Sequence, residues 1–274
     1  MPLGGSFPSC SGASGAVKRV VLSGTDLIVS RLALGLGSLH HVPTSSKRQA
    51  LLSGAFDLGF THFDSSPYYG FGLAEAELGR FLRKARPEVT VASKVGLYPP
   101  GARRSRAFLV YTQKALGKLL PWLSGVVEDW SLPEAERSLE ATLRALGRDY
   151  VDLLLLHEPP GERLNADQFC EWFAKLREKG KIRWWGLAGR IQRVGAWLGH
   201  PVARVVQVPQ RDVPCLAVMG RPPQLTYGAL STRPGGQPAR EALAEALARN
   251  SAGSIIVSSR KATHLRELVE WAER

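Results

Sequence analysis

Short apolar runs alternate along the chain with longer segments in which apolar residues recur every three or four positions. The short runs are typical of buried strands, and the longer segments are typical of amphipathic helices. Strands are predicted at residues 31–37, 61–65, 89–95, 151–156, 182–188, 205–209, 215–219 and 254–258. Helices are predicted at residues 45–58, 73–85, 131–147, 167–179, 191–198, 238–249 and 263–274.

Regular alternation of strand and helix predicts a parallel α/β sheet. Eight such units favour a closed (β/α)8 TIM barrel over an open, doubly wound sheet, which stays the alternative. A β-hairpin at residues 20–29, turning at Ser23 and Gly24, is expected before the first unit. Only a short loop separates residues 205–209 from residues 215–219, so the sixth helix is expected to be shortened or missing.

The chain of 274 residues is long enough for one barrel. Residues 1–17 are rich in Gly, Ser and Pro and are expected to form a flexible N-terminal tail, which leaves residues 18–274 as a single barrel domain. The connection between residues 96 and 131 is unusually long and is expected to contain an extra helix near residues 111–120. Connections of this length are usually functional or disordered.

A net charge of +12 and a sequence pI near 10.0 predict a basic surface that attracts anions. The basic clusters at residues 83–86 and 103–106 lack interleaved aromatic residues, so nucleic-acid binding is not expected, and a phosphate-rich cofactor accounts for some of the charge. The three cysteines are far apart and lack metal-ligand spacing, which argues against a metal site and for a reduced, cytoplasmic setting. No apolar run approaches the ~20 residues that span a membrane.

Candidate chemistry gathers at the ends of three predicted strands. Asp64, Lys94 and His157 each lie at the carboxyl end of a strand, and Tyr69 lies in the loop after Asp64. Taken singly, each has an ordinary explanation, such as a turn cap for Asp64 or a solvated strand end for Lys94. Their shared position favours one site, because active sites of barrels lie at the carboxyl ends of the strands.

These four side chains can move a proton to or from a carbonyl oxygen. Tyrosine has an ordinary pKa near 10, and a neighbouring ammonium such as that of Lys94 is expected to lower it by stabilising the phenolate. Asp64 would hold Lys94 in place, Tyr69 would exchange the proton, and His157 would orient the carbonyl or share the transfer. Side chains contain no hydride donor, so a redox cofactor is required.

The segments that carry these residues resemble the aldo-keto reductases. The resemblance lies in GFTHFDSSPYYGFGLAEAELGRFL, VASKVG, LRALGRDYVDLLLLHEPP, KLREKGKIRWWGLAG and VVQV, and the wording SPYYGFG and SKVG is most similar to the sugar (aldose and galactose) dehydrogenase branch. It implies a TIM barrel in which Asp64, Tyr69, Lys94 and His157 are catalytic. It also implies an aldehyde, ketone or sugar substrate, and NADP as cofactor, with NAD as the alternative.

The resemblance also implies cofactor-binding residues, with some departures. Gln207 matches a residue that holds the nicotinamide amide, but the Ser-Asn pair that shares this task reads Ala188-Gly189. Two registers can place the aromatic residue that stacks on the nicotinamide. A seventh strand at residues 224–230 offers Tyr227, whereas one at residues 215–219 puts Arg221 near the position. The second register is preferred, because Gly-Ala-Leu then follows the strand as in the family.

The segment near the C-terminus resembles the part of the family that binds the adenosine phosphate. Ser258, Arg260 and His264 fall on its positions, and a guanidinium such as that of Arg260 suits a 2′-phosphate. Two functions stay open. One is an active nicotinamide-dependent oxidoreductase, and the other is a barrel that keeps the four catalytic residues but serves as a binding or regulatory protein.

Overall fold

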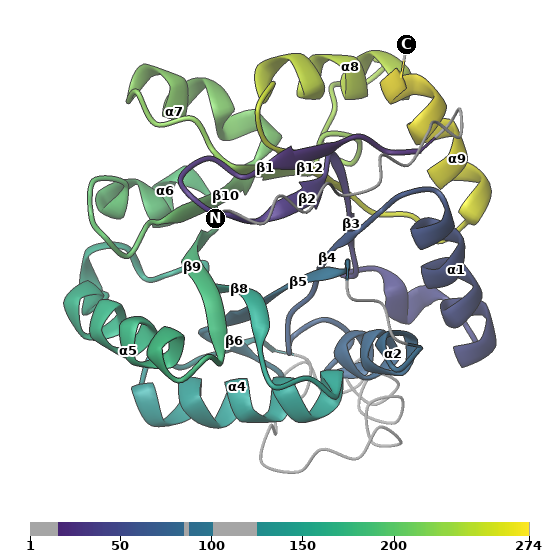
Figure 1. Cartoon of the computed structure of the whole chain (residues 1–274). Coiled ribbons are helices and arrows are strands. Elements are labelled where there is room, and N and C mark those ends of the chain that lie inside the picture. Colours follow the sequence, from purple (N-terminus) through teal and green to yellow (C-terminus); the bar gives the residue numbers. More distant parts are fainter. Residues whose placement is uncertain (1–15, 85–87, 101–124, 274) are drawn as a thin grey trace, which may run out of the picture.

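The computed structural model describes residues 16–84, 88–100 and 125–273, and they form a closed parallel barrel (Figure 1). The last strand pairs with the first, with Ile255 opposite Leu32, so the sheet has no free edge. The (β/α)8 barrel predicted from the alternation is therefore confirmed. Its strands in chain order are β3 (Leu32–Gly35), β4 (His62–Asp64), β5 (Thr90–Val95), β8 (Val151–His157), β9 (Ile182–Ala188), β10 (Val205–Pro209), β11 (Leu225–Tyr227) and β12 (Ser254–Val257).

An outer layer of helices surrounds the strands (Figure 1). Local signals set several of the helix ends: Gly147 ends α4 with a left-handed φ of 64°, and the side chain of Asn165 caps α5 by accepting a hydrogen bond from the Gln168 amide. The helices are α1 (Ser45–Asp57), α2 (Leu73–Leu82), α4 (Leu132–Leu146), α5 (Ala166–Glu178), α6 (Ile191–Val194), α7 (Val213–Val218), α8 (Ala239–Arg249) and α9 (Ala262–Glu273). Single 3-10 turns lie at Leu39–His41, Gly161–Arg163, Gly195–Trp197 and Gln210–Asp212.

The predicted hairpin is confirmed and covers the N-terminal end of the barrel. Its strands β1 (Arg19–Val21) and β2 (Ile28–Ser30) pair antiparallel and lie across the barrel in Figure 1. Leu22, Leu27 and Val29 are fully buried and pack on inward-facing residues near the start of the barrel strands. This end of the barrel is therefore closed by apolar side chains, and a site can open only at the other end.

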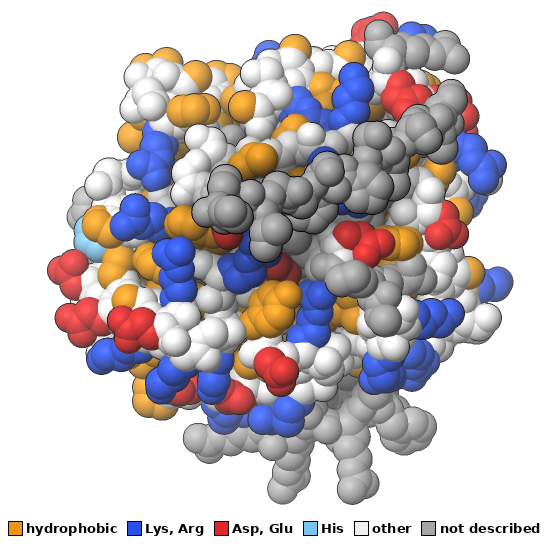
Figure 2. All heavy atoms as spheres, in the orientation of Figure 1, with side chains coloured by type: hydrophobic (Ala, Val, Ile, Leu, Met, Phe, Trp, Pro, Cys, Tyr) orange, Lys and Arg blue, Asp and Glu red, His pale blue; other side chains and the backbone are white. Residues whose placement is uncertain are grey.

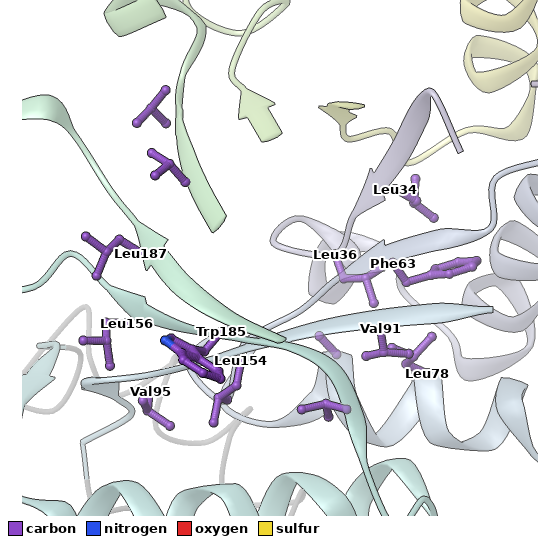
Figure 3. Close-up of a cluster of buried hydrophobic side chains, with 14 of the residues drawn as sticks. Leu34, Leu36, Phe63, Leu78, Val91, Val95, Leu154, Leu156, Trp185 and Leu187 are labelled. Carbon is purple, nitrogen blue, oxygen red and sulfur yellow. The ribbon is translucent and has the colours of Figure 1, made fainter. Parts of the chain in front are cut away.

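The main hydrophobic core lies between the strands and the helices (Figure 3). Alternate residues of a strand point to opposite faces, so Leu34, Phe63 and Val91 pack outward against the helices while their neighbours point into the barrel. Full burial of such a side chain stabilises the fold by roughly 1.5–3 kcal/mol. The same alternation turns Asp64 and Lys94, next to outward-facing Phe63 and Val95, toward the barrel interior.

The strand predicted at residues 215–219 is wrong. Residues 215–218 belong to helix α7 and Met219 is its C-cap, and the seventh strand is β11, whose Leu225 pairs with Gln207 of β10. A short apolar run cannot be assigned to strand or helix by periodicity alone. Here Pro at the first turn favours a helix, and the side chain of Val218 is 90% exposed, unlike a buried strand residue. The expectation of a shortened sixth helix is confirmed, because α7 has six residues.

Two further expectations concern the tail and the long connection. Val17, the last residue of the expected tail, is buried, and its amide donates a hydrogen bond to the Leu58 carbonyl at 3.1 Å. The division into a tail and a single domain stays a prediction. The long connection begins and ends in a small antiparallel hairpin of β6 (Leu97–Tyr98) and β7 (Val127–Glu128), and the extra helix expected near residues 111–120 lies outside the described residues.

Close packing of α2 on α4 depends on the absence of a side chain at Gly79. A Cβ at this position would lie 2.0 Å from the carbonyl oxygen of Ala145, so backbone would have to move. Gly79→Ala is expected to lower the free energy of unfolding by about 1–3 kcal/mol, as overpacking does. Urea denaturation measures this. Gly199→Ala is the control, because a Cβ there meets no atom within 4 Å, and an equal loss in both variants would contradict the packing argument.

Candidate active site

Three of the four predicted catalytic residues meet through the ammonium of Lys94. Its Nζ lies 2.7 Å from Asp64 Oδ1 and 3.3 Å from the Tyr69 hydroxyl, and it also donates to the Ser65 carbonyl at 2.9 Å. An ammonium has three donors, and these three oxygens match that number. The Lys94 side chain is only 1% exposed, so the pair with Asp64 is fully withdrawn from water.

Tyr69 reaches back to Lys94 because the chain turns sharply after β4. The Tyr69 amide donates to the Ser66 carbonyl at 2.9 Å, and Gly70, Phe71 and Gly72 all have positive φ, at 59°, 57° and 85°. A run of left-handed residues is rare, because only glycine adopts this region without steric cost. The turn keeps the Tyr69 ring over the end of the barrel before α2 begins.

His157, at the end of β8, completes the group. Its ring is 6.0 Å from the Tyr69 ring, centre to centre, and nearly perpendicular to it at 88°. The Ser66 hydroxyl lies 3.5 Å from His157 Nδ1, a contact that sequence reasoning missed. When Ser66 donates to Nδ1, the ring hydrogen sits on Nε2, which can then donate to a ligand.

Burial sets the protonation of this group. It raises the pKa of Tyr69 well above its ordinary value, and the carboxylates of Asp64 and Glu158 raise it further. The pKa of Tyr69 is therefore not lowered overall, as Lys94 alone would lead one to expect, because withdrawal of the phenolate from water dominates. Burial, aided by the charge of Lys94, lowers the pKa of His157 well below its ordinary value. At neutral pH Tyr69 thus carries its proton and His157 is uncharged.

A cavity of about 390 Å³ opens above these residues. Gln207 lines it, its side chain is almost fully buried, and its Oε1 has no hydrogen-bond partner among the described residues. An unpaired buried acceptor costs free energy, so a ligand that donates an N–H here is favoured. A nicotinamide carboxamide fits this requirement. Tyr227, set aside by the preferred register, also lines the cavity, as do Ala188 and Gly189.

A second, larger cavity of about 1110 Å³ adjoins the first through Ser258, which lines both. Arg260 and His264, also predicted from the sequence, line it together with two lysines that sequence reasoning missed, Lys47 and Lys261. The side chains of Lys47, Arg260 and Lys261 are all exposed at its rim. Three cations around one cavity suit a phosphate group.

Arg221 does not join either cavity. It follows α7, and its guanidinium donates to the carbonyl of Ala203, which precedes β10 at the closed end of the barrel. The register that placed Arg221 beside the cofactor is therefore wrong.

Glu158 is a cavity residue that sequence reasoning passed over. It follows His157, lines the first cavity and a neighbouring one, and has a left-handed φ of 54°. Its position directly after a candidate catalytic residue was the available signal.

The described parts of the chain contain no helix long and apolar enough to cross a bilayer. In the same residues, no three His, Cys, Asp or Glu side chains are grouped so as to hold a metal ion. On the face seen in Figure 2, Lys and Arg side chains are interspersed with Asp and Glu.

Residues 31–209 match the family model described as the aldo/keto reductase family. The chain is 28% identical to a D-threo-aldose 1-dehydrogenase from a Pseudomonas species, over 82% of this chain and 63% of that protein. It is 29% identical to a pyridoxal 4-dehydrogenase from Microbacterium luteolum, over 75% of this chain and 63% of that protein. The chain thus spans less than two thirds of the length of these relatives.

Solved structures share the barrel. An aldo-keto reductase from Bacillus halodurans, in its holo form, superposes with a TM-score of 0.75 at 21% identity, over 94% of this chain and 91% of that chain. An aldo-keto reductase from Klebsiella pneumoniae in complex with NADPH superposes with a TM-score of 0.69 at 22% identity, over 94% and 90%. At these identities the likeness establishes the fold.

A buried carboxyl group, Glu75 on α2, lies behind the wall that carries Lys94. It accepts hydrogen bonds from the Ser93 hydroxyl at 2.7 Å and the Thr142 hydroxyl at 3.0 Å. Burial raises its pKa from 4.5 to about 7, against these hydrogen bonds and the charge of Lys94, which lower it. The folded state therefore binds an extra proton between these pH values, and stability is lost as pH rises from about 4.5 to about 7.

Glu75→Gln is expected to remove this loss of stability with rising pH, while it keeps both hydrogen bonds to Oε1. Relative to wild type, the free energy of unfolding of the variant should rise by on the order of 3 kcal/mol as the pH increases from 5 to 8. This is the linkage value of the pKa shift. Urea denaturation at both pH values measures this. Glu136→Gln, on the exposed face of α4, is the control, and parallel pH profiles for wild type and Glu75→Gln would refute the assignment.

Proposed function

The chain belongs to the aldo/keto reductase family, and we propose that it is a nicotinamide-dependent oxidoreductase that interconverts a carbonyl group and the corresponding alcohol. The observation that carries this proposal is the arrangement of Lys94 between Asp64 and Tyr69, beneath a cavity that His157 and Gln207 also line. The bound nicotinamide would supply or accept the hydride, which no side chain can do.

In our proposal Tyr69 donates the proton to the carbonyl oxygen. Its raised pKa keeps the hydroxyl protonated at neutral pH, so the proton to be donated is present. As the proton leaves, negative charge develops on the phenolic oxygen, and the Lys94 ammonium at 3.3 Å stabilises it. Asp64 keeps that ammonium aimed at Tyr69. The neutral ring of His157 donates from Nε2 and orients the carbonyl for the transfer.

Binding of the cofactor would use both cavities. Gln207 Oε1 is the acceptor for the nicotinamide amide, and Ser258, Arg260 and His264 line the space for the adenosine phosphate. The cations Lys47, Arg260 and Lys261 support NADP over NAD, because a 2′-phosphate would lie among positive charges. The Klebsiella relative in complex with NADPH adds support to this choice.

The proposed substrate is a sugar, or another small aldehyde or ketone. Relatives include a D-threo-aldose 1-dehydrogenase and an L-galactose dehydrogenase from Arabidopsis thaliana, the latter 30% identical over 61% of this chain and 47% of that protein. We further propose a single barrel domain in a cytoplasmic setting, with neither metal, membrane nor nucleic acid as partner. Among the described residues, Cys170 and Cys215 are free thiols.

The alternative, a barrel that only binds or regulates, is favoured by one feature. Ala188 and Gly189 lack the polar side chains that would complete the amide-binding group. Calorimetric titration with NADPH and NADH tests this directly. Failure of both to bind at millimolar concentration would overturn the enzyme proposal.

Tyr69→Phe is expected to lower kcat by a factor of about 10²–10⁴, the usual contribution of a positioned proton donor. Binding of NADPH should persist, because the ring that lines the cavity stays in place. Steady-state reduction of an aldose panel and cofactor titration measure the two quantities. Tyr68→Phe is the matched control, since the Tyr68 ring contacts Phe71 and not Lys94; near-wild-type turnover in Tyr69→Phe would refute its role.

Arg260→Met is expected to weaken NADPH binding about tenfold to a hundredfold, the effect of losing one hydrogen bond to a charged group. NADH binding should change little, because NADH lacks the 2′-phosphate. Calorimetry with both cofactors measures the difference. Arg266→Met removes an exposed cation from α9 that lines neither described cavity and serves as the control. Equal weakening of NADPH and NADH would contradict the assignment.

A further inference from the structure

We propose that Glu158 makes this site favour the oxidised, positively charged form of the nicotinamide cofactor over the reduced form. The inference rests on the proposed function, since it concerns how the same cavity treats the two cofactor states. It assigns Glu158 a role in binding selectivity, which is separate from the proton transfer of Tyr69.

Glu158 and Gly189 form a matched pair in the cavity wall. A Cβ at Gly189 would lie 3.0 Å from Glu158 Oε2 and 3.2 Å from its Cα, tighter than most real contacts. The Glu158 amide donates to the Ala188 carbonyl at 2.6 Å, and its Oε2 accepts from the Arg190 amide at 3.3 Å. The missing side chain at Gly189 thus makes room for the carboxylate.

The backbone of Glu158 supports a functional reading. It is left-handed at φ 54°, a region that costs free energy for any residue with a Cβ. Such strain persists only where surrounding contacts hold the backbone in place, and strained residues cluster at functional sites. The chain therefore holds a carboxylate at this point of the wall although a glycine would fit the backbone better.

Glu158 leaves a net negative charge on the cavity. Asp64 and Lys94 neutralise each other at 2.7 Å. Arg190 Nε lies 3.6 Å from Glu158 Oε2, but the Arg190 side chain is 53% exposed, so solvent screens its charge. The carboxylate contributes to raising the pKa of both Tyr69 and Tyr227, so its field reaches two walls of the cavity.

The carboxamide links Glu158 to the cofactor. A carboxamide has two N–H donors, and the acceptors that line the cavity include Gln207 Oε1 and the Glu158 carboxylate. Both line the cavity that also contains Tyr69, so a ring bound there lies within the field of Glu158. The oxidised ring carries a positive charge and the reduced ring carries none, so the carboxylate attracts one state selectively.

Glu158→Gln tests this, because it removes the charge and keeps the shape. Calorimetry with NADP⁺ and NADPH gives the two Kd values, and the ratio of the NADPH Kd to the NADP⁺ Kd should fall about tenfold, a modest fraction of the Coulomb energy at close range. Glu158→Asp keeps the charge and should stay within about threefold of wild type. Glu140→Gln, which removes a carboxylate paired with Lys181 outside the barrel, should leave the ratio unchanged.

Arg190→Gln gives an expectation of the opposite sign. It removes an exposed cation beside Glu158, so the ratio should rise, by roughly twofold to threefold for a solvent-screened charge. This variant keeps the proposal testable if Glu158→Gln fails to fold. An unchanged ratio in Glu158→Gln, or a fall in Arg190→Gln, would overturn the proposal while both cofactors still bind. Failure of the wild-type protein to bind either cofactor would instead overturn the proposed function, and this inference with it.

Discussion

The buried ion pair of Lys94 and Asp64 is the constraint on which the site depends. Removal of an ammonium and a carboxylate from water costs several kcal/mol per ion, and it is tolerated only where other hydrogen bonds complete the pair. The Ser65 carbonyl and the Tyr69 hydroxyl provide them. The contact that aims Lys94 at Tyr69 is therefore also one of the contacts that allow Lys94 to be buried.

The barrel holds this pair by closing one end and leaving the other open. Apolar residues of the N-terminal hairpin seal the end where the strands begin, and the tight layer between strands and helices stiffens the wall. Behind the wall, Ser93 donates to the buried carboxyl of Glu75 beside Lys94. Asp64, Lys94 and His157 thus lie at the carboxyl ends of their strands, where loops can admit a ligand.

Two sequence expectations failed for related reasons. The apolar run at residues 215–219 lies on a six-residue helix whose end is exposed, because an apolar segment does not reveal whether a sheet or a helix will receive it. The pKa of Tyr69 rises although Lys94 is adjacent, because its direction depends on burial as well as on neighbours. Both errors concern the surroundings of a residue, which its neighbours in the chain do not specify.

The barrel, its closing hairpin and the meeting of Asp64, Tyr69, Lys94 and His157 could be predicted from the sequence alone. Strand and helix periods are local, and the ends of parallel strands must share one edge, so these features follow from spacing along the chain. Other features become visible only in the folded chain: Tyr227 rather than Arg221 faces the cavity, Gln207 Oε1 has no partner among the described residues, and Glu158 fills the space beside Gly189. These features depend on desolvation and on contacts between residues far apart in sequence, which exist only once the barrel has closed.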